Sequence, residues 1–316
     1  MEEVYYIIIK RRKELMGIAI IMVLLYHLCC WPQWNNPLRI FGHWFIGVDL
    51  FLFLSGFGLC FSYEKNDIKT FYYHRFIRVV PLFWFYTLVI FISNFFILGN
   101  EYTVKQLFYN LTTLSFWINT GKEPNWYVSA LIFFYLFFPV FYKSVKKFPT
   151  TSFLFYFTIS LLILKYARIE WYHDCFISRI PIFVFGILYF LSSKSHHFFR
   201  KALIISLFFW NVAIEYCSSP YFLAASICPT LLIVGLPILG NRQIINKKIN
   251  DYISCIGSYS YELFLSNGLT YLTLKTLNNI YHITLPTIIL IYIISTFFYG
   301  LIFIRISTLI NRLLKQ

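Results

Sequence analysis

Ten apolar stretches follow one another along the chain, separated by short polar segments, and this succession restricts the fold more than any other feature. Most are close to the length of about 20 largely apolar residues that a membrane-spanning helix needs. The sequence therefore predicts an all-α integral membrane protein, with about ten transmembrane helices in one bundle. The predicted spans are Leu15–Trp31, Phe45–Tyr63, Val79–Ile97, Trp126–Tyr142, Thr151–Leu164, Ile180–Ser193, Ala202–Cys217, Tyr221–Leu239, Ser258–Lys275 and Leu285–Ile304.

Composition excludes a soluble domain as the source of these stretches. The 316 residues are 59% hydrophobic and 13% charged, whereas a soluble domain is about 25% charged and about 45–50% apolar. Aromatic residues make up 22% of the chain, which suits lipid contact and the membrane interface. We expect the amphipathic segment Tyr102–Ile118 at that interface, and residues 1–316 to form a single transmembrane domain.

The distribution of Lys and Arg predicts the orientation of the helices. Placing the N-terminus in the cytoplasm puts 20 of the 27 basic residues in inner segments. Short cytoplasmic loops of membrane proteins carry such an excess, so both termini are predicted to be cytoplasmic. The seven basic residues left in outer segments are Arg39, Lys105, Lys122, Lys165, Arg168, Arg179 and Lys275.

Charge and cysteine content narrow the partners. The net charge of +14 fits anchoring beside anionic lipid, and no basic, polar-faced domain is present to bind nucleic acid. The seven cysteines are scattered, without a CxxC or Cys/His metal spacing. We therefore expect the lipid bilayer as a partner, no metal and no bound cofactor, with the cysteines as small apolar fillers.

Two polar residues near the outer ends of the first two spans are candidate catalytic residues. His27 lies about 18 Å beyond Leu15 along a helix, and a neutral imidazole there can take a proton from a hydroxyl. Alternatively, a helix neighbour satisfies the imidazole. Asp49 begins the second span and could orient an imidazole by accepting its N–H; alternatively, the helix dipole alone favours an Asp near a helix N-terminus.

Other polar residues are candidates for binding substrates. Arg75 and Arg78 share one helix face at an inner helix start and could hold phosphates, or could be ordinary cytoplasmic anchors. Glu262 lies inside the ninth span, where a carboxylate should be paired or line a cavity, unless it reaches the inner headgroups. Asn267 extends the same polar stripe. Trp126 opens the fourth span, where an aromatic belt is expected and sugar stacking is the alternative.

Several of these segments, in this order, resemble the membrane acyltransferase 3 family of polytopic O-acyltransferases that modify cell-surface glycans. FIGVDLFLFLSGF is close to the second-helix signature of the family and is the most specific stretch. MGIAIIMVLLYH resembles the first-helix motif that ends in the essential histidine of the family, here His27. FYYHRFIRVVPLFW, NWYVSALIFFYLFFP and SYELFLSN resemble the basic inner loop, the fourth-helix motif and a late-helix motif. The resemblance spans essentially the whole chain.

The resemblance implies an activity and roles for individual residues. The donor is expected to be a cytoplasmic acyl-CoA, usually acetyl-CoA, and the acceptor a hydroxyl of a cell-surface or lipid-linked glycan. A bacterial-type plasma (inner) membrane is the expected location. His27 matches the essential histidine, Asp49 lies within the second-helix signature, and Arg75 and Arg78 match the arginines of the basic loop.

Two positions depart from the family pattern. The family usually has Arg or Lys eleven residues before the histidine, where this chain has Met16, with Lys13 one turn earlier. The late motif often ends in histidine, where this chain has Asn267. Because of these departures, a degenerate, non-catalytic member of the family stays an alternative interpretation.

A transporter or flippase for a lipid-linked sugar also stays open. It would share the helix count, and polar residues inside its spans would mark a pathway. The sequence has no pair of Gly/Pro-broken helices at matching positions in two halves, a pattern typical of many transporters.

The orientation is testable with reporters fused to the C-terminus. Because the charge asymmetry places this end in the cytoplasm, a reporter active only in the cytoplasm should be active, and one active only outside should be silent. The reverse result would contradict the predicted orientation.

Overall fold

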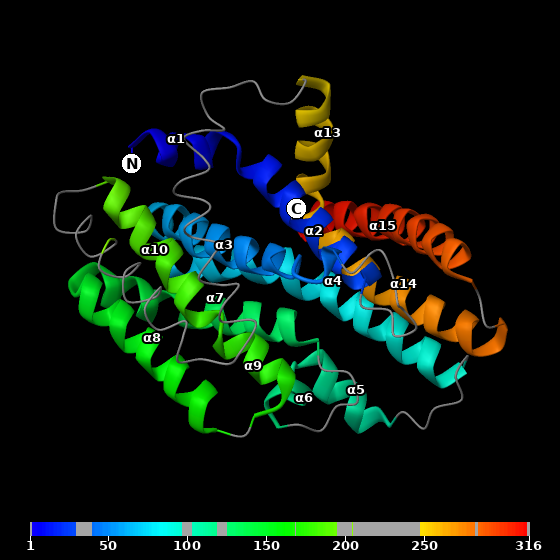
Figure 1. Ribbon diagram of the computed structural model, residues 1–316. Helices are drawn as coiled ribbons and strands as arrows, with labels where there is room; N and C mark the ends of the chain where they lie inside the picture. The colour runs from blue at the N-terminus through cyan, green and yellow to red at the C-terminus, as the bar shows by residue number, and fades with distance from the viewer. Residues whose placement is uncertain are drawn as a thin grey trace. The chain divides into compact units, whose positions relative to one another are not determined.

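All secondary structure in the described part of the chain is helical (Figure 1). The computed structural model describes residues 2–29, 40–96, 103–118, 125–167, 169–194, 204, 247–281 and 284–314. The helices are α1 Glu2–Lys10, α2 Arg12–Cys29, α3 Ile46–Lys65, α4 Ile68–Phe96, α5 Val104–Leu111, α6 Leu114–Trp117, α7 Trp126–Lys147, α8 Pro149–Tyr166, α9 Trp171–Ile177, α10 Ile180–Lys194, α13 Lys247–Ser258, α14 Ser260–Tyr281 and α15 Leu285–Leu314.

Five helical segments of the described part are long and apolar enough to cross a membrane. They are α3, α4, α7, the run Trp171–Ser192 that includes α9 and most of α10, and α15. The predicted spans Leu15–Trp31, Thr151–Leu164 and Ser258–Lys275 correspond to α2, α8 and α14, which are helices of sufficient length but not of that apolar composition. The predicted spans Ala202–Cys217 and Tyr221–Leu239 lie outside the described residues. The all-helical class is confirmed for the described residues, and five of their helical segments suit a membrane, while the number ten and the position of the termini stay predictions.

The segment expected at the interface forms two short helices, α5 and α6. Thr103 caps α5 through a capping box, in which its hydroxyl accepts from the backbone of Gln106 and the Gln106 side chain accepts from the backbone of Thr103. Val104 and Phe108 are exposed on one side of α5. The amphipathic pattern therefore corresponds to a short helix with an uncovered apolar side.

The chain divides into two compact units, which are described separately. The first comprises Met1–Cys29, Asn35–Ile68 and Phe133–Ser258. The second comprises Cys30–Trp34, Lys69–Ile132 and Tyr259–Gln316.

In the first unit, α3 lies between α2 and α10, and glycines bring the backbones close together. A Cβ on Gly47 would touch Ala19 of α2, and one on Gly56 would overlap the carbonyl oxygen of Phe183 in α10. Gly186 of α10 faces α3 in the same way, since its Cβ would overlap the carbonyl oxygen of Phe53. Small residues allow this close approach, which drives helix association in membranes.

Aromatic side chains fill the space around α10. Phe183 of α10 stacks on Phe134 of α7 with ring centroids 4.4 Å apart. Phe185 meets Phe153 of α8 edge to face at 6.0 Å. All four rings are buried. The abundant phenylalanine of the sequence is thus used for packing between helices as well as for lipid contact.

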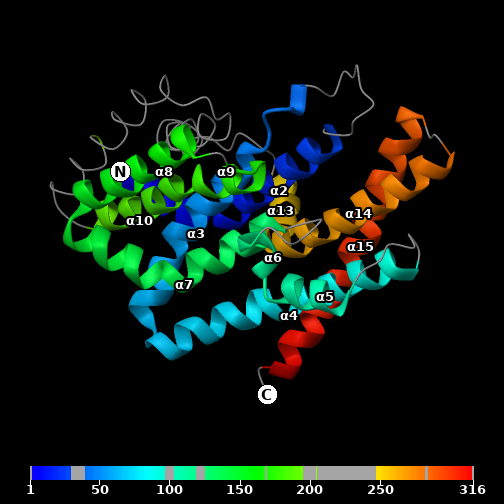
Figure 2. The ribbon, with the colours of Figure 1, turned by 90° about the horizontal axis from the view of Figure 1, so that it is seen from below.

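In the second unit, α14 packs against both α4 and α15. Tyr261 of α14 donates a hydrogen bond to the carbonyl oxygen of Val79 in α4, 2.9 Å away. Thr296 of α15 donates to Thr270 at 3.3 Å. Figures 1 and 2 both show α14 and α15, in orange and red, as a hairpin joined at one end. Polar contacts therefore hold α14 on two sides.

The relative directions of paired helices agree with the predicted alternation of spans. In the first unit α3 and α10 run parallel, because Asp49 pairs with Arg179 at their starts and Phe57 meets Phe190 farther along. In the second unit α4 and α14 run parallel and α15 runs against them. An alternation of ten spans requires these directions, since these pairs are the second and sixth and the third and ninth spans.

The close contact between α3 and α10 predicts an unusual response to a methyl group. Gly56→Ala should lower the melting temperature of the detergent-purified protein, because the overlap costs about 1–3 kcal/mol against a helix-propensity gain of about 1 kcal/mol. Gly300→Ala is the control, because its Cβ would meet only the flexible end of Leu263 at 2.9 Å. Thermal unfolding followed by size-exclusion chromatography measures both. A Gly56→Ala protein as stable as Gly300→Ala would contradict the contact.

Candidate active site

His27 lies in the last turn of α2, on the side that continues the contact with α3. Ala19, Val23 and His27 are spaced four residues apart, so they follow one side of the helix. A Cβ on Gly47 would touch both Ala19 and Val23. His27 itself is half-buried. The histidine thus ends the row of α2 side chains that faces α3.

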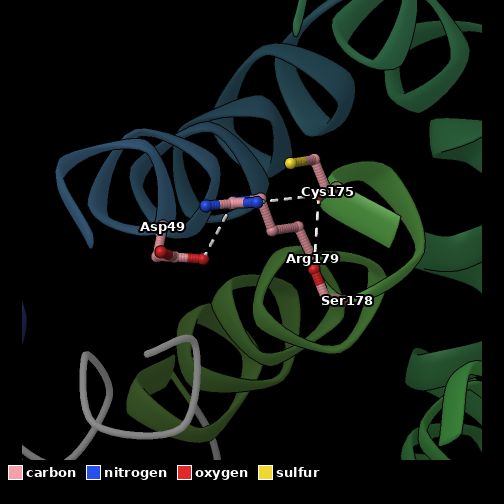
Figure 3. Close-up of polar contacts among 4 residues, drawn as sticks. All are labelled: Asp49, Cys175, Ser178 and Arg179. Carbon is pink, nitrogen blue, oxygen red and sulfur yellow. Dashed lines mark hydrogen bonds and ion pairs between the residues drawn. The ribbon is translucent and has the colours of Figure 1, made fainter. Parts of the chain in front are cut away.

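Asp49, in the first turn of α3, forms a buried ion pair with Arg179 (Figure 3). The Nε atom of Arg179 is 3.1 Å from Oδ1 of Asp49, and the side chains are 1% and 0% exposed. The approach is an ion-pair contact without the alignment of a hydrogen bond, and Oδ2 of Asp49 accepts no hydrogen bond from the described residues. Burial makes this pairing necessary, because an uncompensated charge there would be costly.

Arg179 joins three helices. It lies in the two-residue turn between α9 and α10, and its Nη1 donates to the carbonyl oxygen of Cys175 in α9 at 2.9 Å. Ser178 donates to the same oxygen at 3.3 Å. Together with the contact to Asp49, these bonds tie the end of α9 and the start of α10 to the start of α3.

The Asp49 carboxylate points away from the helix that carries His27. Asp49 follows Gly47 by two residues, which is about 200° around a helix, and Gly47 faces α2. Gly56, on the same side as Asp49, faces α10. The hypothesis that Asp49 orients His27 therefore stays a prediction, and the partner that the structure gives to Asp49 is Arg179.

The sequence contains a signal that Arg179 is a candidate functional residue. The distribution of charge places Arg179 among the outer basic residues, and the residue directly precedes the apolar run Ile180–Ser193. An ionised Asp buried in one span needs a partner such as a cation from another span. Arg179 directly precedes the sixth predicted span, and Asp49 lies near the start of the second. Pairing these two ends needs the knowledge that α3 and α10 run parallel.

Arg75 and Arg78 lie on one side of α4 in the second unit. Arg75 is half-buried, and its guanidinium carbon lies 5.9 Å from the ring centroid of Phe71, one helical turn earlier. Arg78 is exposed. The hydrogen bond from Tyr261 to Val79 fixes the backbone next to Arg78. One arginine is therefore braced by a ring, and the other extends from an anchored helix.

Glu262 and Asn267 belong to a polar seam between α14 and α15. Glu262 accepts a hydrogen bond from Ser307 at 2.7 Å, and the side-chain oxygen Oδ1 of Asn267 accepts one from the hydroxyl of Tyr292 at 2.6 Å. Asn267 and Tyr292 are buried, whereas Glu262 is half-buried. The sequence predicted a polar stripe here, and the structure adds its partners on α15.

Trp126 begins α7 and is half-buried. Its neighbour Tyr127 is buried, and its ring lies 4.5 Å from the ring of Phe264 in α14, between Glu262 and Asn267 in sequence. The second unit therefore holds Trp126 on a helix start that contacts the polar seam.

A family model described as an acyltransferase domain matches residues 15–305 of the chain. The chain belongs to the acyltransferase 3 family. The chain is also 27% identical, over 186 residues, to a protein of Acidianus two-tailed virus named "Putative acetyltransferase ORF330". The chain spans about half the length of that relative, since the match covers 52% of it and 57% of this chain. No solved structure matches the chain.

The family match begins in α2 and ends in α15, so it includes parts of both units. Every candidate residue lies inside it. These residues are His27, Asp49, Arg75, Arg78, Trp126, Glu262 and Asn267. Among the described residues of the chain, no cluster of His, Cys, Asp and Glu gathers with the geometry of a metal site.

The start of α2 offers a basic residue near Met16. Lys13 is exposed, whereas Arg12, four residues before Met16 on the same side of the helix, is half-buried. The guanidinium of Arg12 lies over Gly58 of α3, since a Cβ there would come within 2.6 Å of Nη2. Arg12, rather than Lys13, therefore turns toward α3.

Proposed function

We propose that this protein is a membrane-bound acyltransferase that moves an acyl group, in most cases acetyl, from acyl-CoA to a hydroxyl of a cell-surface or lipid-linked glycan. The match of the acyltransferase family to residues 15–305 carries this proposal. The apolar helices support a multi-pass position in a bacterial-type plasma membrane. The similarity to a viral protein with an acetyltransferase name supports acetyl as the group.

In the proposed reaction His27 is the general base. Its imidazole accepts the proton of the acceptor hydroxyl while the oxygen attacks the thioester carbonyl. Collapse of the tetrahedral intermediate breaks the carbon–sulfur bond, forms the ester and releases CoA, whose thiolate takes up the proton. The position of His27 at the half-buried end of α2 supports this role, because the imidazole combines a fixed helix with access for a substrate.

Arg75 and Arg78 are the proposed residues for the donor phosphates. A guanidinium binds phosphate in bidentate fashion, and both lie on one side of α4. The brace of Arg75 on Phe71 and the anchored backbone next to Arg78 support a fixed geometry. Acyl-CoA is then a substrate, and no resident cofactor is proposed.

Trp126, Glu262 and Asn267 are the proposed residues for the acceptor. An indole can stack on the apolar side of a sugar ring, and a carboxylate and an amide can bind its hydroxyls. Ser307 and Tyr292 occupy only part of the hydrogen-bonding capacity of Glu262 and Asn267.

The role of His27 is tested by His27→Ala in cells that express the full chain. Loss of a general base typically costs about 10²–10⁴-fold in rate, so glycan mass spectrometry should show no acetylated species while the protein remains in the membrane. His43→Ala is the matched control, an exposed histidine in the same unit.

The control must keep the acetylation for the comparison to count. Glycan that stays acetylated in the His27→Ala strain would remove His27 as the base. Loss of the glycan itself from cells that lack the protein would instead favour a flippase. A wild-type strain with unmodified glycan would favour a non-catalytic relative.

The role of the arginines is tested by Arg78→Ala. Removing a guanidinium from the donor phosphates should raise the KM for acetyl-CoA about tenfold or more, which corresponds to about 1.5–3 kcal/mol for a charge-assisted hydrogen bond. Lys69→Ala is the control, an exposed cation on the opposite side of the same helix. If both variants lower only the amount of inserted protein and leave the KM unchanged, Arg78 is a cytoplasmic anchor.

A further inference from the structure

We propose that Arg179 is a positioning residue, which acts through its ion pair with Asp49 to hold α3 in the orientation that acyl transfer at His27 requires. This inference rests on the proposed function. It assigns Asp49 to the same pair and gives it no direct part in the proton transfer.

The first step is the burial of the pair formed by Asp49 and Arg179. Asp49 and Arg179 are 0% and 1% exposed, in the first turn of α3 and just before α10. The neighbouring side chains Val48, Leu50 and Phe176 are apolar and buried. Arg179 is the charged partner of the buried Asp49, and removal of either side chain would change the environment of the other.

The second step is the geometry of Arg179. Its guanidinium contacts Asp49 through Nε and the carbonyl oxygen of Cys175 through Nη1, as Figure 3 shows. An arginine near a helix C-terminus commonly binds its last carbonyl groups in this way. Because one guanidinium makes both contacts, the ion pair links the start of α3 to the end of α9.

The third step is the transmission from α3 to His27. Gly56 of α3 touches the backbone of α10 about 10 Å along the helix from Asp49. With the backbone contact at one point and the ion pair at another, α3 has little freedom to rotate. The opposite side of α3 meets α2 at Gly47, in the row of side chains that His27 ends. A rotation of α3 would therefore displace the support of this row.

The test replaces the pair as a unit in the full-length protein. A buried ion pair can often be exchanged for apolar residues without loss of stability, whereas removal of one partner is strongly destabilising. Three variants are compared with the parent, namely Asp49→Leu, Arg179→Met and the double variant. Transfer of label from acetyl-CoA that carries 14C in its acetyl group to the glycan and glycolipid fractions of isolated membranes is measured per folded molecule, with the folded fraction taken from size-exclusion chromatography.

The proposal expects strong non-additivity. Each single variant should lower kcat about tenfold or more, with the KM for acetyl-CoA unchanged, and the double variant should recover most of the loss, because coupling between contacting residues typically lies between about 0.5 and 3 kcal/mol. The pH profile of kcat/KM of the double variant should match the parent, because the general base is intact. If the single variants do not fold, the conservative variants Asp49→Asn and Arg179→Lys are measured in their place, with the same loss of kcat per folded molecule expected.

Two results would overturn it. A folded double variant without label transfer would show that Asp49 itself takes part in the chemistry. An Arg179→Met protein with the kcat of the parent per folded molecule would show that the pair serves stability alone. Failure of the proposed function looks different, because the parent protein would then transfer no label in the same membranes.

Discussion

A charge buried among apolar helices must be compensated, and the arrangement of the first unit depends on this requirement. Asp49 and Arg179 are far apart in sequence and are each surrounded by apolar residues. Their attraction holds the starts of α3 and α10 together, in the parallel direction that the predicted alternation of spans requires. Apolar contacts alone would define the position of one helix along the other less sharply, because phenylalanine packs on phenylalanine at many positions. The ion pair is thus better understood as a determinant of register than as a source of stability.

The second unit solves the same problem with neutral groups. Its seam pairs hydroxyls with an amide, a carboxylate and other hydroxyls across α14 and α15. In bilayers such bonds contribute modestly to stability, about 0.6 kcal/mol on average in one well-studied helical protein. Their number and spacing still determine the position of α14 along α15. The half-buried position of Glu262 leaves part of its carboxylate for other partners, which is why a seam can also serve as a binding surface.

The sequence predicted the helical class because hydrophobic stretches of membrane length have few other solutions. It also placed His27 at a helix end and Arg75 and Arg78 on one helix side, because both follow from local periodicity. The partners of Asp49 and Asn267 were not predictable in this way. They come from α10 and α15, and which helices are neighbours depends on close backbone contacts at glycines such as Gly56. Periodicity describes one helix at a time and does not reveal its neighbour. The extra reach of Arg12 over Gly58 was missed for the same reason.

The pairing of α14 with α4 has a consequence for biosynthesis. Val79 and Tyr86 of α4 find their partners Tyr261 and Gly268 only after more than half of the chain has been translated. In the first unit α2 likewise receives Gly257 of α13 late. Early helices must therefore remain in the bilayer with polar groups that lack their final partners. Chaperones of the insertion machinery, and the proteases that survey new membrane proteins, would encounter both units in an incomplete state until the ribosome reaches the last hairpin.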